Sequence, residues 1–140
     1  MIIDTSALVA ILLGEKGADA LLDAVTQASG VIPAPVHVEF LRVAGGQRLR
    51  LRAEGAALLE KLERLGHTLV AFTPAHAALA AAADPLYGTG NGIGKSGGGP
   101  LNMLDLMVYA VAKERGEPLL CTGKDFRQTD AEIHGASRPY

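Results

Sequence analysis

LNMLDLMVY, residues 101–109, opens a helix that we expect to run to about Arg115, and it determines the fold of the chain. A helix that is apolar on nearly all sides lies in the interior of a protein. Asp105 stands in the middle of this stretch. An ionised carboxylate buried there costs several kcal/mol or more unless it is paired, hydrogen-bonded or bound to a metal. The ordinary alternative is that Asn102 caps the helix and Asp105 compensates free N–H groups in the first turn.

The composition indicates one globular domain. The chain has 140 residues, 49% of them apolar, and a mean hydropathy of +0.22, which excludes a disordered chain and suggests apolar surface for a partner. The net charge of −2 gives no general attraction to nucleic acid, so a polyanion would need a local basic patch or a metal. The single cysteine, Cys121, excludes an internal disulfide framework and lies in a buried strand pattern typical of inert packing.

The start of the chain carries no targeting pattern. It begins with the strand-like MIID and lacks a basic segment, and no apolar run reaches the ~18 residues of a membrane span. We therefore expect a soluble cytoplasmic protein with no membrane partner.

Short apolar strands alternate with helices along the whole chain. Strands are predicted at residues 1–3, 31–34, 68–72 and 118–122. Helices are predicted at residues 7–13 (capped by Thr5 or Ser6), 18–28, 35–44, 52–65, 74–83 (broken by Asp84-Pro85) and 101–115. This alternation predicts an α/β fold: a short central parallel sheet covered by helices on both faces, with residues 1–140 as a single domain.

Three further carboxylates occupy unusual positions. Asp4 and Asp125 each follow a strand, at the edge where parallel sheets bind ligands. Glu39 shares a helix face with Val36 and Val43, which predicts a carboxylate on a buried stripe. Each has an ordinary alternative: a helix N-cap for Asp4, a turn for Asp125, and an ion pair with Arg42 for Glu39.

Taken together, these acids predict a metal site. Clustered carboxylates repel one another and cannot all ionise unless a cation lies among them. Oxygen ligands suit Mg²⁺ or Mn²⁺, and such ions activate water and bind phosphoryl oxygens. The acids therefore indicate metal-assisted phosphodiester chemistry.

Four segments together resemble a known family: IIDTSALVAIL at the start, APVHVEFLRV, LNMLDLMVYAVAKERGEPLL, and CTGKDFRQTDAEI near the end. In order and spacing they are similar to the PIN-domain ribonucleases, and among them to the VapC-type toxins of bacterial toxin–antitoxin pairs. The resemblance covers essentially the whole chain and implies a PIN-like three-layer sandwich.

The resemblance also implies roles for individual residues. Asp4, Glu39, Asp105 and Asp125 match the acidic quartet that holds Mg²⁺ or Mn²⁺. Ser6 and Thr122 match polar positions that orient this cluster or its waters, and Asp130 fits a supporting position next to it.

The implied reaction is endonucleolytic hydrolysis of RNA by metal-activated water, leaving a 5′-phosphate and a 3′-hydroxyl. The implied partners are a small antitoxin protein that covers the cleft and a second copy of the chain in a homodimer. One departure concerns Leu104, which stands where many relatives have glycine before the aspartate and makes the helix start bulkier.

Other function classes fit the residues less well. A haloacid-dehalogenase-like phosphatase needs a second aspartate two residues after Asp4, where this chain has Ser6. A catalytically weak binding module of the same fold would lose acids, and all four are present. A PIN-domain nuclease of RNA processing, without a toxin role, stays open.

The remaining motifs are weaker. GTGNGIGKS, residues 88–96, nearly matches a phosphate-binding P-loop, but Thr89 replaces a required glycine and the flanking sequence does not fit. Lys95 in this loop and Arg42 in the basic run with Arg48, Arg50 and Arg52 are candidate RNA-binding residues. The four histidines show no zinc-binding spacing.

Overall fold

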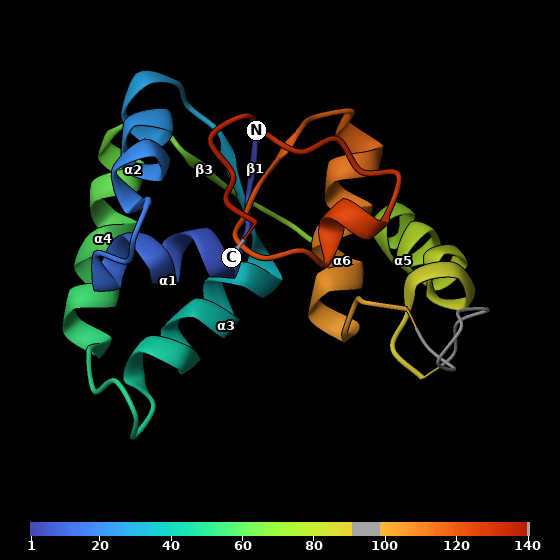
Figure 1. The fold of residues 1–140 in the computed structure, drawn as a ribbon, viewed down its shortest axis with the longest axis horizontal. Helices are drawn as coiled ribbons and strands as arrows, with labels where there is room; N and C mark the ends of the chain where they lie inside the picture. The colour runs from blue at the N-terminus through green and yellow to red at the C-terminus, as the bar shows by residue number, and fades with distance from the viewer. Residues whose placement is uncertain (91–98, 140) are drawn as a thin grey trace.

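The four predicted strands form one parallel sheet at the centre of the molecule (Figure 1). The structure is a computed structural model that describes residues 1–90 and 99–139. The strands, in the order β3-β2-β1-β4, are β1 (Ile2–Ile3), β2 (Val31–Pro33), β3 (Thr68–Val70) and β4 (Leu119–Leu120). Because all four run in the same direction, residues that follow different strands meet at one edge of the sheet.

In the described part of the chain, six α-helices cover this sheet. They are α1 (Thr5–Leu13), α2 (Ala18–Gln27), α3 (Ala34–Gly45), α4 (Arg52–Arg64), α5 (Pro74–Tyr87) and α6 (Met103–Arg115), and a 3-10 helix η1 (Phe126–Gln128) follows β4. Figure 1 shows α1, α2 and α4 on one side of the sheet and the α5–α6 pair on the other. The expected α/β sandwich is confirmed.

The core is built from the strands and from α6. The residues of β1 and β4 are fully buried, as expected for short apolar strands of a parallel sheet covered by helices on both faces. Residues 108–112 of α6 are all buried, which confirms that this helix is apolar on nearly all sides. Met103 in its first turn is 70% exposed, so the start of α6 reaches the surface. Cys121 is buried as expected, and burial raises the pKa of its thiol to about 11.

Two details differ from the sequence predictions, and a third decides between two of them. Helix α5 does not break at Asp84-Pro85 but continues to Tyr87. The carbonyl that Pro85 leaves without a donor lies in the last turns, on the exposed Ala81, where water can satisfy it. Of the two capping arrangements that the sequence allowed for helix α1, the structure has the one with Asp4 as N-cap and not the one with Thr5 or Ser6. Val43 is 38% exposed, so the face that carries Glu39 is only partly buried.

Within the described residues, no helix is long and apolar enough to cross a membrane.

Candidate active site

Asp4 lies directly after β1 and caps the helix that follows it. Its Oδ2 atom accepts hydrogen bonds from the backbone N–H of Ser6 (2.9 Å) and from the Ser6 hydroxyl (2.5 Å). The side chain is nearly inaccessible to solvent. Burial raises the pKa of Asp4, the bonds from Ser6 oppose this shift, and the charge of Glu39 adds to it. Asp4 is therefore both the predicted N-cap and a buried acid beside a second acid.

Ser6 connects the ends of two neighbouring strands. Its hydroxyl donates to Asp4 and accepts a bond of 3.0 Å from the backbone N–H of Thr122, which follows β4. Ser6 therefore links Asp4 to the segment that follows β4. Thr122 makes this contact through its main-chain N–H.

Glu39 reaches the same edge from α3. Its carboxylate accepts a hydrogen bond from the hydroxyl of Thr5, a buried residue in the first turn of α1. Arg42 is exposed, and no ion pair between it and Glu39 occurs among the described residues. The alternative in which Glu39 only pairs with Arg42 is therefore wrong.

Asp105 takes part in capping α6, and its carboxyl group also has a raised pKa. The backbone N–H of Asp105 donates to Asn102 Oδ1, and the N–H of Asn102 donates to Asp105 Oδ2, each at 3.0 Å. The side chain is half-buried. Burial raises the pKa of Asp105 to about 7, and repulsion from Asp4, Glu39 and Asp125 adds to the shift. Asp105 is therefore near enough to the other three carboxylates for their charges to act on it.

Asp125 completes the group from the segment after β4. It follows Gly123, whose backbone φ of 86° is in the left-handed region that favours glycine, and it precedes η1. Its side chain is exposed and does not cap η1. The turn expected from the sequence is present.

The four acids are suited to a divalent cation in kind and in charge. All donors are carboxylate oxygens, the ligands that Mg²⁺ and Mn²⁺ prefer, and their mutual repulsion is what a cation relieves. In residues 1–90 and 99–139, no three acidic, histidine or cysteine side chains converge on one point as a preformed cage. The oxygens of Asp4, Glu39 and Asp105 instead accept bonds from Ser6, Thr5 and Asn102.

Comparison with known proteins gives the family. Residues 1–132 match the PIN domain. Over 132 residues the chain is 38% identical to the VapC ribonuclease Mb2780c of Mycobacterium bovis, covering 93% of this chain and 95% of that protein. The chain belongs to the PIN-domain family.

Further relatives of this PIN domain are also VapC proteins. The chain is 36% identical to the ribonuclease VapC36 of Mycobacterium tuberculosis, with 96% of this chain and 94% of that protein covered. It is 38% identical to the ribonuclease VapC of Mycolicibacterium smegmatis, with 96% of this chain and 100% of that protein covered. The resemblance inferred from the four sequence segments is confirmed.

Asp130 of this PIN domain does not touch the four acids. It accepts a hydrogen bond from the Tyr109 hydroxyl (2.6 Å) and one from Lys113 Nζ (2.9 Å), which hold the C-terminal segment against α6. These bonds lower the pKa of Asp130. Tyr109 lies one helical turn after Asp105, so Asp130 acts on the helix that carries the carboxylate and not on the carboxylate itself.

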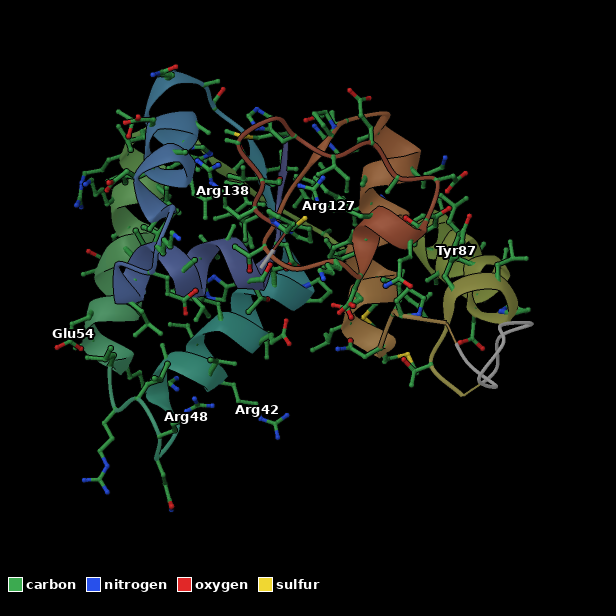
Figure 2. The ribbon with its side chains drawn as sticks, in the orientation of Figure 1. Arg42, Arg48, Glu54, Tyr87, Arg127 and Arg138 are labelled. Carbon is green, nitrogen blue, oxygen red and sulfur yellow. The ribbon has the colours of Figure 1, made fainter. Side chains whose placement is uncertain are left out.

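The predicted RNA-binding residues have different outcomes. Figure 2 shows Arg42 and Arg48 projecting outward at the end of α3, away from the sheet. Lys95 lies outside the described residues, as does most of the P-loop-like stretch.

Thr5 is a site residue for which the sequence suggested only a capping role. Its contact with Glu39 joins α1 to α3, and nothing in the local sequence indicates that partner. The only feature of the sequence that could have indicated a site role for Thr5 is its position between Asp4 and Ser6, which places its polar side chain at the same edge of the sheet.

Proposed function

We propose that this PIN domain is a divalent-metal-dependent endoribonuclease and the toxin of a VapBC-type toxin–antitoxin pair. The observation that carries the proposal is the group of four carboxylates, which come from four separate segments. Burial and the charges of the other three raise the pKa of Asp105. The relatives named VapC ribonuclease support the same activity.

In this proposal, Asp4, Glu39, Asp105 and Asp125 hold the metal. When bound, Mg²⁺ or Mn²⁺ supplies water activation and charge compensation at the phosphate. Ser6 and Thr5 orient two of the four carboxylates through their hydroxyls. Hydrolysis breaks the bond between phosphorus and the 3′-oxygen, which leaves a 5′-phosphate and a 3′-hydroxyl.

The toxin role implies partners. We expect a small antitoxin protein that covers the acidic cleft, a homodimer, and action in the cytoplasm by a chain that folds as one domain. Large apolar side chains that are more than half exposed, namely Val38, Leu69, Leu86 and Met103, provide surface that such contacts would bury.

The test is cleavage of total cellular RNA by the purified chain in Mg²⁺, in Mn²⁺ and in EDTA. Asp4→Asn and Asp105→Asn should each remove cleavage. Asp23→Asn, which changes an exposed acid of α2, is the matched control and should cut like the wild type. Equal cleavage by all four proteins, or full cleavage in EDTA, would refute the proposed site.

A further inference from the structure

A groove of about 570 Å³ lies between α3 and the start of α6. Its walls include Val38, Glu39, Arg42, Val43, Gly46 and Leu104, and we call it the α3–α6 groove. Its volume falls within the range of sites that hold small ligands, roughly 300–1,000 Å³.

The groove is continuous with the acidic site. Glu39 belongs to both, and Leu104 directly precedes Asp105. On the basis of the proposed function, we propose that the α3–α6 groove is a nucleotide-binding subsite. It holds one unpaired base of the RNA next to the cleaved phosphodiester, and Leu104 determines which base is preferred.

The charges along the groove suit a polyanion that enters the acidic site. Arg42 lies three residues after Glu39 on α3, so it is a neighbour on the helix surface, and it is exposed. A guanidinium group binds phosphate oxygens with two parallel hydrogen bonds. Arg48 lies in the turn that follows α3 and also projects outward (Figure 2). The chain as a whole carries a net charge of −2 and does not attract RNA in general. The attraction of a phosphate next to the cleavage point therefore depends on this local positive charge.

The apolar walls suit a base rather than a phosphate. Val38 is 67% exposed and lies on the side of α3 opposite the buried Val36, Phe40 and Ala44, and Val43 is 38% exposed beside that buried face. Proteins that read single-stranded RNA take splayed bases between flat or apolar side chains, and the bases of a duplex are not available for this. The groove has aliphatic walls, an arginine on one wall and the carboxylate of Glu39 beside the acidic site. It therefore suits a nucleotide of single-stranded RNA better than a base-paired one.

Leu104 is the groove residue contributed by α6, opposite the side chains of α3. Its side chain is half-buried. Its size sets the width of the groove beside Asp105. Removing this side chain widens the subsite and weakens discrimination between bases of different size.

The experiment maps cleavage of a pool of short single-stranded RNAs of random sequence, and measures binding of the same pool by fluorescence anisotropy in EDTA. Leu104→Gly should lower kcat/KM by about tenfold or more and lose base preference at one position next to the cut. Val38→Ala should show a smaller loss at the same position. Leu104→Met, which keeps the volume, should lose less base preference than Leu104→Gly. Leu79→Ala, which removes an exposed leucine of α5 outside the groove, is the control and should retain the wild-type pattern.

Each other outcome overturns the inference. If Leu104→Gly cuts at the same sequences as the wild type with the same kcat/KM, the groove is not a subsite, while the ribonuclease function stands. If the variants cut normally but escape inhibition by the cognate antitoxin, the groove is a protein-binding surface. If the wild-type chain neither binds nor cuts RNA, the proposed function fails and this inference fails with it.

Discussion

Thr5 and Glu39 are joined by a hydrogen bond although 34 residues separate them in the sequence. The Thr5 hydroxyl donates from the first turn of α1 to a carboxylate of α3. Thr5 therefore orients Glu39, and its neighbour Ser6 bonds to Asp4. Two of the four carboxylates are thus held by hydroxyl groups of one short segment.

Thr5→Val should weaken divalent-metal binding by about tenfold, because residues that orient metal ligands typically contribute 10–100-fold to affinity. Valine keeps the shape of threonine and removes only the hydroxyl. Thr5→Ser retains the hydroxyl and should bind nearly as the wild type does. Calorimetric titration with Mn²⁺ measures both. Equal affinities for the valine and serine variants would show that the Thr5 contact does not matter for the site.

Ser6→Ala should destabilise the fold as well as the site. The change leaves the Thr122 N–H without its acceptor and removes a donor from the buried Asp4. An unsatisfied buried group costs ~1–3 kcal/mol, which urea denaturation resolves. Ser29→Ala, at an exposed position after α2, is the control and should change little. A Ser6→Ala variant as stable as the control would contradict the assigned contacts.

Much of this site could be predicted from the sequence because its acids follow strands or open a helix. Asp4 and Asp125 come after β1 and β4, and parallel topology alone brings such residues to one edge. Asp105 could be assigned by its apolar surroundings. Both interpretations of Asp105 are compatible, since its carboxylate caps the helix and is also near enough to the other acids for their charges to raise its pKa.

The contacts between helices could not be predicted. The Thr5–Glu39 bond and the Tyr109–Asp130 bond depend on how α1, α3, α6 and the C-terminal segment pack, and no periodicity encodes those pairings. The position at which α5 ends could not be predicted from local sequence rules either. A proline disfavours helix in general, but near a C-terminus it removes only one bond at an exposed carbonyl.

The metal-free protein should become less stable as the pH rises from about 4 to about 7. The pKa of Asp105 is 3.8 in an unfolded chain and about 7 in the fold, so the native state binds more protons in this range. The stability that protonation provides is full below pH 4 and is lost as the pH passes 7.

Asp105→Asn should flatten this slope, and saturating Mg²⁺ should reverse the loss in the wild type. Asp4 shifts in the same direction, so some slope remains in the variant. Urea midpoints measured at several pH values in EDTA test this. A slope unchanged by Asp105→Asn would contradict the raised pKa.

Tyr109→Phe should destabilise the chain by about 1 kcal/mol, because it removes the bond to Asp130 while keeping the buried ring. The value is at the low end for a bond to a carboxylate because the Asp130 side chain is 58% exposed. Tyr87→Phe is the matched control, since Tyr87 packs edge-on against the ring of Tyr109. Equal stability of the two variants would mean that the C-terminal segment is held by other contacts.

The most direct test of the central claim is whether the four acids form one metal site. Mn²⁺ binding to the full chain is measured by electron paramagnetic resonance for the wild type and for Asp4→Asn, Glu39→Gln, Asp105→Asn and Asp125→Asn, with Asp23→Asn as control. We predict saturable binding to the wild type and the control, and at least about tenfold weaker binding for each of the four variants. Wild-type affinity in the Asp4 and Asp105 variants would contradict the assignment of the site.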